Sequence, residues 1–219
     1  MTEEIWSKVD DYYLPLVAQD DALRLAVTES EKAGLPSIQV APNQGKLLHL
    51  LARIRGARSI LEVGTLGGYS TIWLARALPK DGKLVTLEID PKHADVAKKN
   101  LAHADIHNVD VRVGRAIDTL EQMKKNKEGP FDLVFIDADK PSNLDYFNAA
   151  LDMSKPGTII VVDNVVRAGR VTDASSTDVN VLGVRRMRDA LAKETRVSTT
   201  VLQTVGVKGY DGLVVALVL

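Results

Sequence analysis

Apolar residues within positions 1–55 recur at the spacing of α-helices. An early helical face is formed by Ile5, Val9, Tyr12, Tyr13 and Leu16, and a later, broader one by Leu47, Leu48, Leu50, Leu51 and Ile54. The segments Gly34–Pro36 and Ala41–Asn43 interrupt the pattern between the two faces. The amino-terminal quarter of the chain is therefore predicted to be helical.

From residue 58 onwards, short runs rich in β-branched residues and leucine alternate with longer helical stretches. We expect strands at Ser59–Val63, Lys83–Glu88, Val109–Val113, Phe131–Asp137, Thr158–Asp163, Arg196–Gln203 and Gly212–Leu219. Helices are expected between most of them, at Ser70–Ala77, Pro91–Ala104, Ala116–Lys125, Asn143–Met153 and Leu182–Lys193. This alternation is typical of an α/β fold with helices on both faces of a parallel sheet.

The last two expected strands are separated only by Thr204–Asp211, which contains no helical pattern. Strands joined by so short a segment pair antiparallel as a hairpin. The sequence therefore predicts a mostly parallel sheet with one reversed strand near an edge.

The composition narrows the class of protein without identifying it. With 219 residues we expect one domain over residues 1–219, in which residues 1–55 form a helical amino-terminal cap on an α/β core of residues 56–219. The 28 basic and 29 acidic residues give a net charge of −1, so nucleic acid is not favoured as a partner. The absence of cysteine from the sequence excludes disulfides, thiolate metal sites and a cysteine nucleophile.

The amino terminus, Met1-Thr-Glu-Glu-Ile-Trp6, is acidic and lacks the basic start and apolar run of a signal peptide. The apolar run Leu213–Leu219 is far too short to cross a bilayer of roughly 30 Å. We therefore expect a cytoplasmic protein with no membrane partner.

A glycine-rich turn follows the first expected strand, within Glu62-Val-Gly64-Thr65-Leu-Gly67-Gly68-Tyr-Ser70. Glycines allow the backbone to approach a ligand closely, and the start of a helix favours negative groups. The spacing differs from the G-x-G-x-x-G of dinucleotide-binding turns. An acidic Glu62 suits a ligand with a cationic amino-acid end, whose carboxylate Ser70 could bind; a plain tight turn with a solvated glutamate is the alternative.

Two further strand ends carry residues suited to an adenosine group. Glu88 ends the second strand, where an acidic side chain can accept both ribose hydroxyls. Gly114-Arg115-Ala116 follows the third strand and offers backbone N–H groups and a small side chain to a purine. Glu88 fits NAD and S-adenosylmethionine equally well, so these positions do not distinguish the two ligands.

Carboxylates end two neighbouring hydrophobic strands, in Val134-Phe-Ile-Asp137-Ala-Asp139-Lys140-Pro141 and in Ile160-Val-Val-Asp163-Asn164. Unpaired charge at a buried strand end is costly, so a partner is expected. Aspartate and asparagine oxygens suit a hard cation such as Mg²⁺ or Ca²⁺. Either cluster alone also fits helix capping or a solvated loop; together with Glu62 and Glu88 they favour a ligand site.

The remaining candidates for catalysis are weaker. The four histidines, His49, His93, His103 and His107, lie on expected helices or in a loop away from the strand ends, which favours structural or surface roles. The sequence contains no G-x-S-x-G motif for a serine hydrolase.

Four segments together resemble the cation-dependent O-methyltransferase family that includes caffeoyl-CoA and catechol O-methyltransferases. They are Asn43-Gln-Gly-Lys-Leu-Leu48, Leu61-Glu-Val-Gly-Thr-Leu-Gly-Gly-Tyr-Ser70, Phe131-Asp-Leu-Val-Phe-Ile-Asp-Ala-Asp-Lys140 and Val162-Asp-Asn164. The resemblance implies a Rossmann-like seven-stranded sheet with a reversed last strand, and a homodimer. It also implies S-adenosylmethionine and Mg²⁺, or another divalent cation such as Mn²⁺ or Ca²⁺, as cofactors.

The resemblance also assigns roles by matching position. Asp137, Asp163 and Asn164 would be the metal ligands, and Lys140 would be the general base. The positions that would contact S-adenosylmethionine are Val40, Glu62, Gly64, Thr65, Ser70, Glu88, Ala116 and Asp139. Where plant caffeoyl-CoA enzymes have Trp and Asn after the Asp-Asn pair, this chain has Arg167 and Ala168, which disfavours a CoA ester as substrate.

The resulting hypothesis is methyl transfer to a small phenolic acceptor, a vicinal diol of catechol, flavonoid or hydroxycinnamoyl type. Lys140, with Asp137 beside it, would accept the hydroxyl proton, and Pro141 favours an extended backbone at Lys140. Residues 165–180 are expected to form a loop over the substrate. An NAD-dependent dehydrogenase and a non-catalytic S-adenosylmethionine-binding protein are the alternatives.

Overall fold

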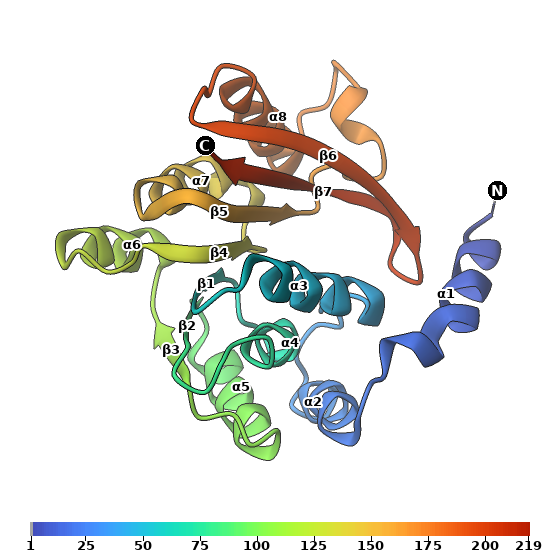
Figure 1. The fold of residues 1–219 in the computed structure, drawn as a ribbon. Helices are drawn as coiled ribbons and strands as arrows, with labels where there is room; N and C mark the ends of the chain where they lie inside the picture. Colours follow the sequence, from blue (N-terminus) through green and yellow to red (C-terminus); the bar gives the residue numbers. More distant parts are fainter. Residues whose placement is uncertain (1) are drawn as a thin grey trace.

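A computed structural model describes residues 2–219, and its centre is a seven-stranded sheet (Figure 1). The strands are β1 (Ser59–Val63), β2 (Lys83–Glu88), β3 (Val109–Val113), β4 (Phe131–Ile136), β5 (Ser154–Asp163), β6 (Val197–Gly206) and β7 (Gly209–Val218), in the order β3-β2-β1-β4-β5-β7-β6. The first five are parallel, whereas β7 runs antiparallel to both β5 and β6. The predicted α/β class, Rossmann-like sheet and reversed last strand are confirmed.

Helices cover both faces of this sheet (Figure 1). They are α1 (Glu3–Val17), α2 (Asp21–Lys32), α3 (Pro42–Arg55), α4 (Tyr69–Ala75), α5 (Pro91–His103), α6 (Ala116–Lys125), α7 (Asn143–Asp152) and α8 (Val179–Leu191). Side chains of α3, α4 and α5 share one buried cluster, and those of α6, α7 and α8 share the other. The two clusters lie on opposite sides of the strands.

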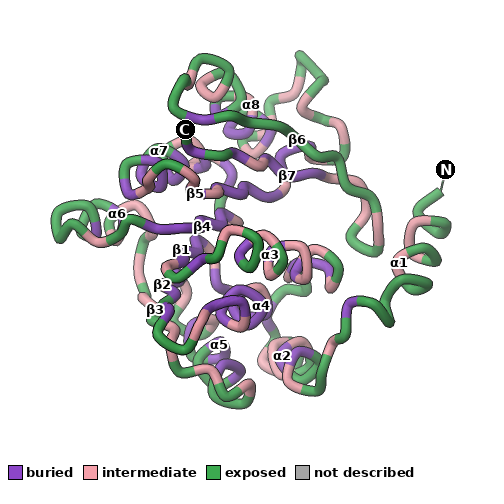
Figure 2. The backbone as a smooth tube through the Cα atoms, in the orientation of Figure 1, coloured by how far each residue is buried: buried purple, intermediate pink, exposed green. Residues whose placement is uncertain are grey.

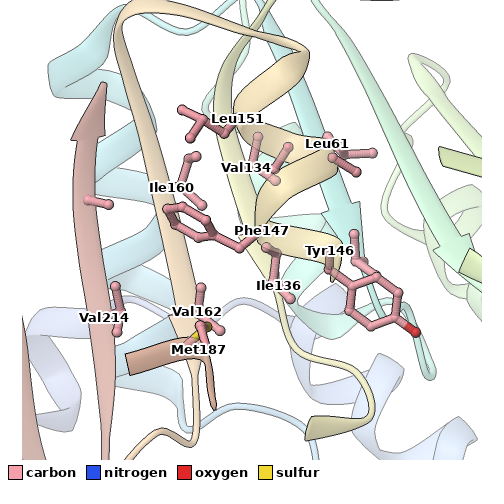
Figure 3. Close-up of a cluster of buried hydrophobic side chains, with 14 of the residues drawn as sticks. Leu61, Val134, Ile136, Tyr146, Phe147, Leu151, Ile160, Val162, Met187 and Val214 are labelled. Atoms are coloured by element: carbon pink, nitrogen blue, oxygen red, sulfur yellow. The ribbon is translucent and has the colours of Figure 1, made fainter. Parts of the chain in front are cut away.

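Alternation along the central strands supplies both clusters. In β4, Val134 and Ile136 join the α6–α8 side, while Leu133 and Phe135 join the α3–α5 side. Successive strand residues point to opposite faces, so a strand buried on both faces is apolar at nearly every position, and Asp132 is the one exception in β4. Figure 3 shows the α6–α8 side, where Phe147 reaches from α7 toward the strands.

The hairpin of β6 and β7 is longer than predicted. The pairing continues through Thr204–Asp211 and Val205–Tyr210 to Gly206–Gly209, so only Val207 and Lys208 form the turn. The expected strand ends at Gln203 and Gly212 are therefore wrong, because three further residue pairs extend the hairpin beyond the body of the sheet. β5 also begins at Ser154, before the expected Thr158.

The three amino-terminal helices differ in how far they are buried. Ala52 of α3 is fully buried and belongs to the α3–α5 cluster, so this helix covers the sheet as the later helices do. In contrast, α1 lies at the periphery, against α3 and the β6–β7 hairpin, and is exposed along most of its length (Figures 1 and 2). Pro42, which interrupts the sequence pattern, is the first residue of α3.

The carboxyl ends of β1 to β5 meet at one edge of the sheet because these strands are parallel. The chain order reverses between β1 and β4, which is where open α/β sheets bind ligands. Gly64, with φ of 100°, sits at this point, and a Cβ there would lie 2.1 Å from the carbonyl oxygen of Asp137. Glycine at this position therefore allows the loops after β1 and β4 to touch.

A second glycine, Gly183 of α8, gives a test of packing near Lys140. A Cβ on Gly183 would lie 2.3 Å from the carbonyl oxygen of Lys140 and 2.7 Å from Cα of Pro141. Alanine is the better helix former by about 1 kcal/mol, but overpacking against backbone costs about 1–3 kcal/mol. We expect Gly183→Ala to lower the unfolding free energy in urea titrations. Leu182→Ala, on the exposed side of the same helix, is the control; equal or higher stability of Gly183→Ala would contradict this reading.

Candidate active site

A cavity of about 810 Å³ runs along the carboxyl edge of the sheet. This volume is in the upper part of the range of roughly 300–1,000 Å³ found for ligand pockets. Most predicted site residues line it: Val40, Gly64, Thr65, Ser70, Glu88, Ala116, Asp137, Asp139, Lys140 and Asn164. Glu62 and Asp163 are absent from this lining and are 0% and 4% exposed, respectively.

The strand order arranges the lining residues in a row. Ala116 follows β3 and Glu88 ends β2, so both belong to one end of the edge. The glycine turn after β1 lies in the middle, and Asp137 and Asn164 follow β4 and β5 toward the other end. The cavity therefore has an end suited to adenosine and an end bearing carboxylate and amide oxygens.

Glu88 binds the glycine turn as well as facing the cavity. Its Oε2 accepts hydrogen bonds from the backbone N–H groups of Thr65 (3.2 Å) and Leu66 (2.7 Å), and Oε1 accepts from Asp90 N–H (3.0 Å). Leu66 has a φ of 49°, which is unfavourable for a side chain of its kind. The carboxylate of Glu88 therefore stabilises the turn and places its own oxygens at the cavity wall.

Glu62 lies beneath the same turn and is surrounded by hydroxyls. Its Oε1 accepts a hydrogen bond from Ser70 (2.7 Å), and Oε2 accepts from Thr71 (2.5 Å) and Thr86 (2.7 Å). Burial raises the pKa of Glu62 to about 7, although the three hydroxyls oppose the shift. Ser70, which does line the cavity, links this buried carboxyl to the ligand space.

The raised pKa of Glu62 predicts a pH dependence of stability. Below about pH 4.5 the carboxyl is protonated in both states; between 4.5 and about 7 the unfolded chain releases the proton while the folded chain keeps it. The free energy of unfolding therefore falls as pH rises through this window and levels off above it.

Glutamine stays neutral, so the unfolding free energy of Glu62→Gln should not show this fall. The difference in unfolding free energy between Glu62→Gln and the unmodified protein should therefore shift in favour of the variant by about 3 kcal/mol from pH 5 to pH 8. Urea denaturation at both pH values measures the difference, in which the contributions of other titrating groups cancel. Parallel pH profiles of the two proteins would show that Glu62 ionises normally.

Asp137 and Asp163 bring two carboxylates to the β4–β5 end. Asp137 Oδ1 accepts a hydrogen bond from Lys140 Nζ at 2.8 Å, and Asp163 Oδ2 accepts from Gln44 Nε2 at 2.5 Å. Burial, and next the negative charge of Asp137, raises the pKa of Asp163 to about 7. Lys140 Nζ places one positive charge beside the two carboxylates, whereas Gln44 donates a hydrogen bond and carries no charge.

This donor set fits a hard divalent cation. Within residues 2–219, no group of three or more His, Cys, Asp or Glu side chains is placed to hold a metal ion. The oxygen donors at this end are instead the two carboxylates of Asp137 and Asp163 and the amide of Asn164. All three side chains offer oxygen, which Mg²⁺ and Ca²⁺ prefer, and the repulsion between the two aspartates favours added positive charge. Asn164 has a φ of 56° and adjoins Asp163, whose Oδ1 accepts the Asn164 N–H at 2.7 Å.

Lys140 is 6% exposed and begins a short 3₁₀ helix, Lys140–Ser142. The prediction of an extended backbone at Lys140 is therefore wrong, because the Ser142 N–H donates to the Asp139 carbonyl and closes a turn here despite Pro141. The next acid, Asp139, accepts hydrogen bonds from Ser142 Oγ and Tyr146 Oη, both at 2.5 Å. Burial and the bond to Asp139 raise the pKa of Tyr146 to about 12.

The segment after Asn164 has an unusual backbone. Arg167 and Ala168 have φ values of 55° and 54°, and Gly169 follows at 80°. Asp211 of β7 holds the segment, because its Oδ1 accepts the N–H groups of Val166 and Arg167, each at 2.9 Å. The expected loop over 165–180 is partly helical: it includes the 3₁₀ helix Arg170–Thr172, and α8 begins at Val179.

Several site residues were not found from the sequence. His93 of α5 lines the cavity, with Nδ1 at 3.6 Å from Glu88 Oε1, so its interpretation as lying away from the strand ends is wrong. Gln44 falls within a family-like segment, but its contact with Asp163 spans 119 positions. Tyr146 and Asp211 had no sequence signal, because a helical tyrosine and a hairpin aspartate are ordinary in isolation.

Comparison with known proteins gives consistent relatives over the whole chain. A family model described as O-methyltransferase matches residues 17–217. The catechol O-methyltransferase of Niastella koreensis is 53% identical over 220 residues, covering 100% of both chains. The catechol O-methyltransferase of Mycobacterium tuberculosis is 48% identical over 93% of this chain and 91% of its own.

Solved structures agree. An O-methyltransferase from Bacillus cereus in complex with SAH superimposes with a TM-score of 0.97 at 51% identity, covering 100% of both chains. The O-methyltransferase TomG from Streptomyces achromogenes, in complex with SAM, gives a TM-score of 0.96 at 51% identity over 100% of this chain and 99% of its own. With the family model spanning nearly the entire sequence, and with relatives of this identity over full length, the chain belongs to the O-methyltransferase family.

Proposed function

We propose that this protein transfers the methyl group of S-adenosylmethionine to one hydroxyl of a vicinal diol held by a divalent cation, with Mg²⁺ as the first choice and Mn²⁺ or Ca²⁺ as substitutes. The observation that carries the proposal is the pair of neighbouring carboxylates, Asp137 and Asp163, at the β4–β5 end of a cavity whose other end presents Glu88. Asp137 and Asn164 line the cavity, whereas Asp163 is buried, precedes Asn164 in the chain and does not line it. Cofactor and diol would then lie in one row along the sheet edge.

The cofactor end is argued from the residues already described. The oxygens of Glu88 face the cavity beside Ala116 and suit ribose hydroxyls and a purine, respectively. Ser70, Val40 and Asp139 line the middle of the cavity and would surround the amino-acid end. Glu62 would favour a cationic amino group there, since added positive charge stabilises its ionised form. S-Adenosylmethionine, when bound, supplies a methyl group on a positively charged sulfur.

At the other end, Asp137, Asp163 and Asn164 would hold the cation, and Gln44 would orient Asp163 from α3. When bound, the cation lowers the pKa of a diol hydroxyl and fixes its direction of attack. Lys140 Nζ lies 2.8 Å from Asp137 and is nearly excluded from water. The ammonium group that pairs with Asp137 would first have to release a proton, and the neutral amine would then be placed to take the hydroxyl proton. The chain contributes orientation, exclusion of water and a proton acceptor.

The names of two relatives and the ligands in two solved structures support this assignment. Two of them are named catechol O-methyltransferases, and the two solved structures contain SAH and SAM. Membership of the O-methyltransferase family gives no support to the alternatives, an NAD-dependent dehydrogenase or a non-catalytic binding protein.

The direct test is a methyl-transfer assay with labelled S-adenosylmethionine and a neutral catechol such as 3,4-dihydroxybenzaldehyde. We expect transfer with Mg²⁺ and none after treatment with EDTA, with restoration on adding Mg²⁺. Flavonoids and hydroxycinnamoyl thioesters extend the panel. Full activity in EDTA would show that transfer does not need a metal ion. Binding of labelled NAD in preference to S-adenosylmethionine would favour the dehydrogenase over the methyltransferase.

We also propose that a second copy of the chain covers α1 and the outer strand β6. Exposed apolar side chains gather on them: Ile5, Val9, Tyr12, Tyr13 and Leu16 on α1, and Val201, Leu202 and Val205 on β6. β6 is the edge strand, and a net charge of −1 opposes self-association very little. Light scattering should give twice 23.8 kDa; a monomer at micromolar concentration would contradict the dimer.

No helix among residues 2–219 is long and apolar enough to cross a membrane.

A further inference from the structure

Arg167 lines the cavity and has donor capacity that the fold does not use. Its Nε is buried and, within residues 2–219, has no hydrogen-bond partner. The guanidinium carries five N–H donors, and it forms a loose ion pair, with Nη1 3.9 Å from Asp211 Oδ2. The side chain is 23% exposed, and its Nη groups are not among the buried atoms and make no hydrogen bond within residues 2–219, so they are the donors that an acceptor from outside the chain can reach.

Asp211 does not fully neutralise this arginine. Its Oδ1 accepts three backbone N–H groups, from Val166, Arg167 and Gly212, each at 2.9 Å. Such bonds stabilise the negative charge and commit that oxygen to the loop. Asp211 therefore positions the segment that carries Arg167 and pairs only loosely with its side chain.

The other cavity cations are differently placed. Lys140 is held by Asp137 at 2.8 Å, and Arg115 follows β3, at the end assigned to adenosine. Arg167 follows β5, three positions after Asn164, at the end of the sheet edge away from Glu88 and Ala116. A diol bound by the cation would thus extend its remaining substituents toward Arg167 rather than toward the cofactor.

The backbone around Arg167 is strained in a way that a plain loop does not require. Positive φ values at two successive non-glycine residues, Arg167 and Ala168, cost roughly 1–2 kcal/mol each. Asp211 maintains this conformation, and Val165 and Val166 anchor it in the core. Strain retained beside a cavity is characteristic of segments that present a side chain to a ligand.

We propose that Arg167 binds a carboxylate on the acceptor, so that the preferred substrates are aromatic vicinal diols that carry a carboxylate on the ring or on a short side chain. The proposal rests on the proposed function, because it takes the diol to be bound at Asp137, Asp163 and Asn164. Guanidinium and carboxylate match in shape and charge, and their paired hydrogen bonds are among the strong ones in proteins. Arg167 would then determine specificity without taking part in the transfer itself.

The test compares 3,4-dihydroxybenzoate with its methyl ester, which keeps the diol and removes the charge. Both are assayed with S-adenosylmethionine and Mg²⁺ in the unmodified protein and in Arg167→Met, Arg167→Lys and Arg170→Met. Arg170 is an exposed arginine of the same loop that pairs with Asp178 and donates from Nε to the Arg167 carbonyl, so it controls for loss of positive charge together with loosening of the loop. We expect Arg167→Met to lower kcat/KM for the carboxylate by roughly 10- to 100-fold, mainly through KM, and to change the ester by less than about 3-fold.

Arg167→Lys should recover part of the activity on the carboxylate, and Arg170→Met should resemble the unmodified protein on both compounds. Equal losses on the two compounds in Arg167→Met would show a structural role and overturn the proposal, as would an unchanged preference for the carboxylate. If the unmodified protein methylates neither compound, the proposed function itself fails and this proposal falls with it. Turnover of both compounds without any effect at Arg167 overturns this proposal alone.

Discussion

Replacing Asp163 with asparagine is expected to lower kcat/KM for a catechol by more than about 100-fold and to abolish tight binding of Mg²⁺ or Mn²⁺. Residues that merely support metal ligands already account for 10- to 100-fold in affinity or activity, and Asp163 would be a ligand itself. The substitution keeps the shape of the side chain and removes one negative charge. Methyl-transfer kinetics and calorimetric titration with Mn²⁺ measure the two effects separately.

The stability of the same variant distinguishes loss of a ligand from loss of the fold. Asp163 is buried beside Asp137, and both burial and that neighbouring charge raise its pKa to about 7. Removing the charge should therefore leave the metal-free protein equally stable or more stable at pH 8, and should leave affinity for S-adenosylmethionine unchanged. An Asp163→Asn protein that is folded and fully active would show that this carboxylate holds no cation.

Replacing Lys140 with methionine is expected to reduce kcat by about 100- to 10,000-fold, the range that a positioned general base contributes. Lys140 is nearly buried, and its Nζ lies 2.8 Å from Asp137 Oδ1, at the end of the cavity assigned to the diol. Affinity for S-adenosylmethionine should remain close to that of the unmodified protein, because the residues assigned to the cofactor are intact. Single-turnover kinetics and cofactor binding give the two quantities.

Lys140→Arg is the matched variant, because it keeps the positive charge beside Asp137 but does not release a proton in the accessible pH range. If Lys140 accepts the hydroxyl proton, arginine should be nearly as slow as methionine. If Lys140 acts only by neutralising Asp137, arginine should restore most of the rate. High activity in both variants would require a different proton acceptor.

Much of the site was predictable because parallel strands end together. Glu88 and Asp137 are polar residues at the ends of apolar strands, and Asp163 ends a third. Once the strands were placed, these side chains had to lie at one edge of the sheet. What each side chain does there was less predictable: Glu62 is buried under hydroxyls instead of lining the cavity, and Gly64 accommodates the Asp137 backbone.

Contacts between distant segments could not be predicted from local pattern. Gln44 reaches Asp163 across 119 positions, and Asp211 fixes Arg167 across 44. His93 approaches Glu88 because α5 begins immediately beyond β2, which turns its first residues back over the strand end. A helical or loop position carries the same local signal whether or not such a partner exists.

The sequence by itself determined the α/β class, the reversed last strand and the polar strand ends, because hydrophobic periodicity and chain connectivity leave few alternatives for burying the apolar faces. The tertiary structure alone decided the length of the β6–β7 hairpin, the hydroxyl surroundings of Glu62 and the free donor of Arg167. These depend on which side chains meet across the sheet edge, and that follows from packing in three dimensions rather than from spacing along the chain.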